Sequence, residues 1–188
     1  MNPDQTELSD RALAARACAG DGAAFAMIVN RHKLALFRLV AKLIGDDDDA
    51  LDIVQETFVA AHRALGRYDP DRPMRAWLTR IAVNKARDWR RRRAVRRLIS
   101  MVMPDGYAEL PTDAPTTDTI VGDRAELVRV RAAVAALPAN LRETLVLRTF
   151  DGMSQLEAAS LLGVTEKTIE TRLYRARRAL KRALENGA

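Results

Sequence analysis

A set of polar side chains near the end of the chain could form hydrogen bonds and ion pairs with a binding partner. They recur on one side of a single predicted helix and are Lys167, Glu170, Thr171, Arg172, Tyr174, Arg175 and Arg178. The other side carries Ile169, Leu173, Ala176 and Leu180, a stripe that is committed to a core. A helix face rich in Arg, Thr and Tyr can enter the major groove of DNA and bond both phosphates and base edges.

The residues before this face predict how it is positioned. Ser154 and Glu157 form an S-x-x-E capping box at a helix start, and Gly163 suits the left-handed end of that helix. Thr165 is then the N-cap of the next helix. Two short helices joined by a tight turn indicate a helix-turn-helix. The alternative is an ordinary helical hairpin with solvated arginines, and we favour DNA binding because the caps, the turn and the basic face agree.

A second basic helix is predicted over residues 74–97. Trp77, Leu78, Ile81 and Trp89 supply its apolar anchor. Its polar ridge follows at helical spacing and consists of Arg80, Asn84, Arg87 and Arg91. Further arginines lie close together near the end of this helix. They either complement the helix dipole or bind a phosphate backbone. Repulsion between so many like charges favours the phosphate interpretation.

The helix predicted over residues 49–65 carries an anionic patch. We expect Leu51, Val54, Phe58 and Leu65 to be buried on one stripe. Asp52, Gln55 and Glu56 share an exposed face, and spacing alone favours a solvated surface over a protein-docking surface. The preceding run 46–49 predicts an acidic helix start, because it lacks the ligand spacing of a calcium loop.

Composition and periodicity predict an all-α, soluble, intracellular protein of two small domains. The chain has 188 residues, a net charge of +6 and a pI near 10.0, which fit a polyanionic partner. Helical domains are expected at 1–97 and 124–188, joined by a linker over 98–123 that holds five acidic residues and no Lys or Arg. The single Cys18 excludes an intrachain disulfide, and no apolar run is long enough to span a membrane. We expect no cofactor, no metal and no enzymatic activity, and His32 and His62 to be ordinary packed or surface side chains.

The order of these segments resembles an extracytoplasmic-function (ECF) sigma factor of bacterial RNA polymerase. The resemblance covers nearly the whole chain and rests on four blocks in the family's order. These blocks are ARACAGDGAAFAMIVNRH, DDALDIVQETFVAAHRAL with its D-x-x-Q-E pattern, RPMRAWLTRIAVNKARDWRRR, and LPANLRETLVLRTFDGMSQLEAASLLGVTEKTIETRLYRARRALK. The resemblance implies a cytoplasmic transcription-initiation factor, often of a stress response, that is held inactive by an anti-sigma factor.

The resemblance also implies roles for individual residues. Asp52, Gln55 and Glu56 would dock on the clamp helices of the polymerase β′ subunit, and residues 139–150 would help to seat the β flap. The single-stranded −10 element would be held by Tyr68, Asp69, Asp71, Arg80, Asn84, Lys85, Arg87 and Arg91. The −35 duplex would be contacted by Lys167, Thr168, Glu170, Thr171, Arg172, Tyr174 and Arg175. Glu170 departs from the basic residue that relatives often carry, and it is a specificity candidate because a carboxylate can accept from a cytosine amino group.

Two other classes of protein remain as alternatives. A free-standing transcriptional regulator would use the same helix-turn-helix on operator DNA without polymerase. A nucleic-acid enzyme would need a metal site or a paired acid and base, and the sequence offers neither.

Overall fold

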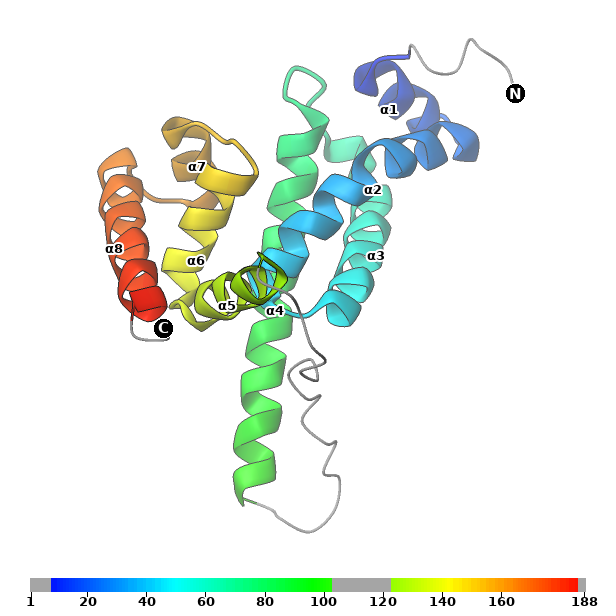
Figure 1. Ribbon diagram of the computed structural model, residues 1–188. Coiled ribbons are helices and arrows are strands. Elements are labelled where there is room, and N and C mark those ends of the chain that lie inside the picture. Colours follow the sequence, from blue (N-terminus) through cyan, green and yellow to red (C-terminus); the bar gives the residue numbers. More distant parts are fainter. Residues whose placement is uncertain (1–7, 103–122, 186–188) are drawn as a thin grey trace.

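The computed structural model describes residues 8–102 and 123–185, and all regular structure in these ranges is helical. The first unit consists of α1 (Asp10–Cys18), α2 (Gly22–Ile44), α3 (Asp47–Ala64), a 3₁₀ turn (Leu65–Arg67) and α4 (Met74–Val102). The second consists of α5 (Asp123–Ala136), α6 (Ala139–Leu145), a π-helical turn (Val146–Phe150), α7 (Gln155–Leu162) and α8 (Glu166–Glu185). Figure 1 shows the two units side by side, and the all-α prediction is confirmed.

Short-range side-chain contacts set the helix boundaries where the sequence predicts them. Ser154 accepts from the amide of Glu157, whose carboxylate accepts from the amide of Ser154 in return. Gly163 ends α7 in the left-handed region at φ 68°, where a Cβ would be strained. Asp46 accepts from the amides of Asp48 and Asp49 at the start of α3, so the acidic cap is confirmed.

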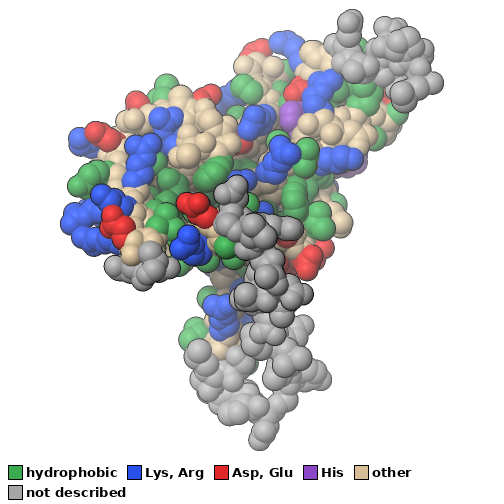
Figure 2. Space-filling view, viewed as in Figure 1, with side chains coloured by type: hydrophobic (Ala, Val, Ile, Leu, Met, Phe, Trp, Pro, Cys, Tyr) green, Lys and Arg blue, Asp and Glu red, His purple; other side chains and the backbone are tan. Residues whose placement is uncertain are grey.

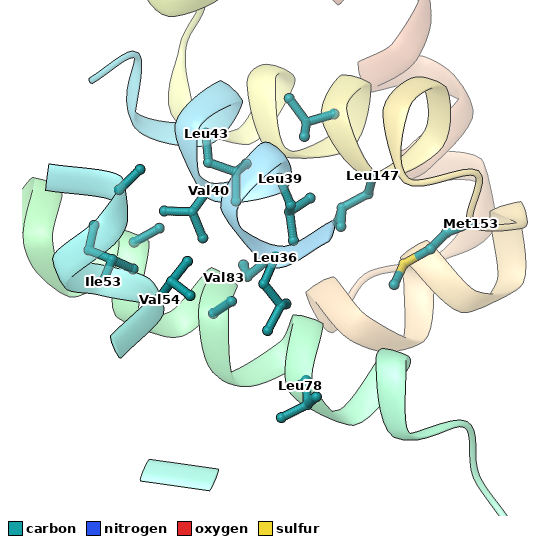
Figure 3. Close-up of a cluster of buried hydrophobic side chains, with 14 of the residues drawn as sticks. Leu36, Leu39, Val40, Leu43, Ile53, Val54, Leu78, Val83, Leu147 and Met153 are labelled. Atoms are coloured by element: carbon teal, nitrogen blue, oxygen red, sulfur yellow. The ribbon is translucent and has the colours of Figure 1, made fainter. Parts of the chain in front are cut away.

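The core of the first unit lies between α2, α3 and α4. Leu36, Val40 and Leu43 of α2 lie on the side of Ile53 and Val54 of α3 and Val83 of α4, whereas Leu39 lies on the side of the second unit (Figure 3). The prediction that Leu51 is buried is wrong, because this side chain is 52% exposed. Val54, Phe58 and Leu65 are buried as predicted, and the buried face of α3 also includes Ala50, Ile53, Thr57 and Ala61, one position round the helix from the predicted stripe.

Two features go beyond the predicted helices. The basic helix continues past Arg97 to Val102, and its last turns project from the body of the molecule (Figure 1). The helix expected over 139–150 widens into a π-helical turn after Leu145, a geometry that is frequent at functional sites. Most of the expected linker, residues 103–122, lies outside the described residues.

Apolar side chains join the two units. Leu147 of the π-helical turn lies beside Leu39 of α2 (Figure 3), and both belong to one continuous buried cluster. Gly45 at the end of α2 packs against α5, where a Cβ on this glycine would lie 2.9 Å from the Cβ of Ala135. Among the described helices, none is long and apolar enough to cross a membrane.

Candidate nucleic-acid interface and docking groove

The predicted DNA-contacting face of α8 is presented to solvent. Ile169 and Ala176 are fully buried against α6 and α7, which fixes the rotation of the helix about its axis. Tyr174 is consequently 65% exposed, and Lys167, Glu170 and Arg175 are also exposed. Figure 2 shows Lys and Arg side chains gathered over α8 at the edge of the molecule.

Hydrogen bonds within α8 arrange part of this face. Thr165 accepts from the amide of Thr168 at 3.2 Å, so the predicted N-cap is present. Thr171 donates to the carbonyl of Lys167 at 2.9 Å. The ammonium of Lys167 lies 3.0 Å from the carboxylate of Glu170, so these two charges compensate each other on the surface. Glu170 therefore reduces the positive charge at the start of the helix that the sequence identifies as DNA-contacting.

The loop between α3 and α4 holds an aromatic pair and two carboxylates. The rings of Tyr68 and Trp77 lie 5.3 Å apart, and the Tyr68 hydroxyl donates to the carbonyl of Arg72. Burial, with the nearby charges of Asp10 and Asp69, raises the pKa of the Tyr68 hydroxyl, which keeps it a neutral donor. Asp69 accepts from the amide of Asp71. This loop thus offers an aromatic wall beside polar groups.

The polar ridge of α4 faces the second unit. Arg80 donates to the carbonyl of Ser160 in α7 at 3.2 Å. Arg87 donates from Nε and Nη2 to the carboxylate of Glu143 in α6. Asn84 is exposed between them, and Arg91 pairs with Asp88 one turn back. Two members of the predicted ridge therefore bind the other unit in this arrangement.

Lys85 lies apart from the other predicted −10 residues. It points away from the ridge and donates to Glu56 of α3 at 3.1 Å. There it joins a shallow groove of ≈ 440 Å³, lined by Asp52, Gln55, Glu56, Val59, Ala60, Arg63 and Lys85. Asp52 and Gln55 are exposed in this groove, and Leu51 and Val59 add exposed apolar surface on the same helix. The three predicted docking residues thus share one groove.

Several charged residues at the boundary between the units were not identified from the sequence. Glu143 is only 3% exposed and binds Arg90 as well as Arg87. Arg142 is also buried and donates to the carbonyl of Leu43 at 2.9 Å. Charged residues are rarely buried unless they are paired, so Arg142 and Glu143 at core-facing positions of α6 are the sequence signal that could have predicted this contact between the units.

The two histidines are ordinary side chains, as expected. His32 is buried and its Nε2 lies 3.0 Å from Asp10, whereas His62 is exposed and packs against the edge of Phe25. Within residues 8–102 and 123–185, no three His, Cys, Asp or Glu side chains gather in a way that could hold a metal ion.

This arrangement of a helical unit with a basic ridge and a separate polar groove, followed by a helix-turn-helix unit, is that of a transcription initiation factor. The sigma-70 region 2 model matches residues 28–96 and the sigma-70 region 4 model matches residues 127–180. The chain belongs to the sigma-70 family of RNA polymerase sigma factors, in its ECF group. Members of this family are non-catalytic regulators that give RNA polymerase its promoter specificity.

Particular relatives extend over almost the whole chain. RNA polymerase sigma factor CnrH of Cupriavidus metallidurans is 42% identical over 189 residues, which cover 98% of this chain and 97% of CnrH. The structure of CnrH in complex with the cytosolic domain of CnrY superposes with a TM-score of 0.69 at 39% identity, covering 95% of this chain and 99% of that one. The sigma factor RpoE of Bartonella quintana, in complex with the anti-sigma factor NepR, gives a TM-score of 0.68 at 25% identity, with 86% and 96% covered.

Proposed function

We propose that the protein directs promoter-specific initiation through three separate surfaces. Its domains are 1–97 and 124–188, joined by residues 98–123, and the two matched regions fall inside the two domains. The observation that carries the proposal is the position of two exposed polar surfaces on different units: the donor face of α8 and the groove beside α3. One binds DNA and the other binds protein.

In the second domain, α8 enters the major groove of the −35 element. Arg172, Tyr174 and Arg175 supply donors for phosphates and base edges, and the exposure of Tyr174 and Arg175 supports this role. Lys167, Thr168 and Thr171 lie nearer the start of the helix, where the positive end of the helix dipole favours phosphate. Glu170 sets base preference in place of a phosphate contact.

In the first domain, the loop after α3 and the ridge of α4 hold the melted −10 strand. Tyr68 supplies an aromatic wall for an extruded base, and Asp69 and Asp71 offer acceptors for its polar edge. Asn84 contacts a base, while Arg80, Arg87 and Arg91 follow the backbone. Lys85 joins this track when it leaves Glu56. These contacts offset the stacking energy that is lost when the duplex opens.

The groove formed by Asp52, Gln55 and Glu56 docks on the clamp helices of the polymerase β′ subunit, and residues 139–150 help to seat the β flap. The lining of the groove combines Asp52 and Glu56 with Arg63 and Lys85 and with the apolar Val59, a mixture of opposite charges and apolar surface that supports a protein partner. The protein acts in the cytoplasm and is not itself an enzyme. Because CnrH and RpoE were solved in complexes with CnrY and the anti-sigma factor NepR, we include a cognate anti-sigma factor among the partners.

A gel shift with promoter DNA separates this function from that of a free-standing regulator. A sigma factor gives a specific, open complex only when core polymerase is added, because its own DNA contacts are divided between two domains. A regulator gives the specific shift alone. Tight sequence-specific binding without core polymerase, unchanged when core is added, would therefore contradict the proposal.

A further inference from the structure

One carboxylate lies at the centre of the boundary between the two units. Glu143 of α6 accepts from Nε and Nη2 of Arg87, with the shortest distance 2.7 Å, and from Nη2 of Arg90 at 3.0 Å. Both arginines belong to α4. Arg87 precedes Glu143 by 56 positions in the chain and Arg90 precedes it by 53, so this one side chain links two distant segments. The contact with Arg87 is bidentate, with Nε and Nη2 on one edge of the guanidinium both donating, a geometry that arginine also uses on phosphate.

The charges at this centre do not balance. Two guanidinium groups, those of Arg87 and Arg90, bind one carboxylate, and the nearby guanidinium of Arg142 donates instead to backbone carbonyls such as that of Leu43. Burial lowers the pKa of Arg90 and of Arg142, and the positive charge of Arg90 lowers that of Arg142 further. Nε and Nη1 of Arg90 and Nε of Arg142 are buried without a hydrogen-bond acceptor in the described parts of the chain. When the two units pack together, these charged donors are buried without acceptors, which costs free energy. The packing of the two units therefore depends on the negative charge of Glu143.

Contacts around the edge hold the same closed arrangement. Arg75 of α4 pairs with Asp151, whose side chain is 5% exposed, and Arg80 donates to the carbonyl of Ser160. On the far side Lys42 lies 5.1 Å from the centre of the Phe150 ring. The second unit thus contacts α4 at Arg75, Arg80, Arg87 and Arg90, while Asn84 between them stays exposed.

We propose that the Glu143 carboxylate occupies, in the closed protein, the place that a nucleic-acid phosphate takes on Arg87 when the ridge of α4 binds DNA. The second domain thereby blocks the ridge until the two domains separate, and DNA and Glu143 compete for the same guanidinium. This inference rests on the −10 role of Arg87 proposed above. The new element is that the two domains of the free protein pack against each other and that the buried Glu143 stabilises this closed arrangement.

The test measures domain separation and DNA binding independently in the full chain. One spin label is attached to the exposed Cys18 of α1 and a second at position 181 after Lys181→Cys, and the distance distribution is measured by electron resonance. Glu143→Gln keeps the size of the side chain and removes the charge. Glu126→Gln, on the exposed surface of α5, is the matched control. A fluorescent single-stranded DNA oligonucleotide of mixed sequence, without core polymerase, reports access to the ridge.

We expect Glu143→Gln to shift the distance distribution to longer values and to tighten oligonucleotide binding by at least about tenfold, because apparent affinity scales with the open fraction. Glu126→Gln should change neither. An unchanged distance distribution in Glu143→Gln would overturn the inference while leaving the proposed function intact. Opening without tighter binding would overturn the masking of the ridge and would also count against the −10 role of Arg87.

A second variant covers the case in which Glu143→Gln loses helix content by circular dichroism. Arg75→Gln removes the exposed partner of Asp151 at the edge of the boundary and leaves the buried centre in place. We expect a smaller shift to longer distances and an increase of about twofold to fivefold in oligonucleotide affinity, since the open fraction rises less. Distances and affinity equal to those of the parent chain would overturn the closed-state inference.

Discussion

Lys85 of α4 donates a hydrogen bond to Glu56 of α3 across 3.1 Å, and this pair joins the two functional surfaces of the first domain. Arg92 reaches the same carboxylate, at 3.8 Å. The helix that we propose for the −10 strand is therefore linked directly to the groove that we propose for polymerase. A polymerase residue that binds Glu56 competes with Lys85, which then becomes available to a phosphate.

The proposed docking groove beside α3 can be tested by changing Asp52, Gln55 and Glu56 together to Asn, Ala and Gln. We expect affinity for core polymerase to fall at least about tenfold, because each lost contact to a charged or polar partner is worth roughly 1 kcal/mol. The measurement is fluorescence anisotropy with labelled protein and core enzyme. Asp48→Asn, on the exposed first turn of α3, is the control. Full affinity in the triple variant with normal helix content would refute the docking groove.

Arg175→Ala tests the −35 face of α8. The duplex affinity should fall by about five- to tenfold, and the slope of log affinity against log salt should decrease by about one, because one phosphate contact is lost. The experiment compares holoenzyme binding to a −35 duplex at several salt concentrations. Arg177→Ala removes an exposed arginine on the opposite side of the same helix and should leave the slope unchanged. Equal slopes in all three proteins would exclude the Arg175 contact.

The capping box of α7 predicts a specific pH dependence. Hydrogen bonds from Ser154 lower the pKa of Glu157 below its ordinary value of 4.5. A carboxylate with a lowered pKa in the folded state stabilises the fold above its unfolded pKa, and this contribution is lost as the pH falls through the folded pKa. Glu157→Gln should therefore lower the stability at pH 7 and flatten its loss below pH ~4.5.

Denaturant unfolding between pH 7 and pH ~3 measures this effect. Glu185→Gln, near the end of α8, serves as the control and should keep the acid-dependent loss of the parent chain. A variant at Glu157 with the same acid dependence as the parent would show that the capping box does not contribute.

Leu147→Ala tests the apolar contact between the two domains. Leu147 is completely buried beside α2, and truncation of such a leucine costs about 2–5 kcal/mol of unfolding free energy. Leu156 has the same side chain but is 65% exposed, so Leu156→Ala should change stability by less than about 0.5 kcal/mol. Equal stabilities of the two variants in chemical denaturation would contradict the packing described for Leu147.

Local features of this fold could be predicted from the sequence, whereas contacts between distant segments could not. Ser154, Gly163 and Thr165 act within one helical turn, so residue type and spacing determine their geometry. The error at Leu51 arose because periodicity fixes a stripe but not its exact rotation against the neighbouring helices. The pairing of Arg87 with Glu143 depends on how two separate units pack, and no local pattern encodes it.

The same distinction applies to the candidate sites. Helical spacing placed Asp52, Gln55 and Glu56 on one exposed face, and they line one groove. It did not show that Lys85 points into this groove, because that depends on the packing of α4 on α3. Arg80 and Arg87 were expected to be open to DNA, and the structure adds that both contact the second unit.

In vitro transcription tests the central claim most directly. Purified protein is added to core RNA polymerase and a library of genomic promoter fragments, with no inhibitor present, and the run-off transcripts are sequenced. The account predicts discrete start sites that share a −35 and a −10 element and that appear only when both protein and core enzyme are present. Failure to direct initiation from any promoter, by protein that is folded and binds core enzyme, would contradict it.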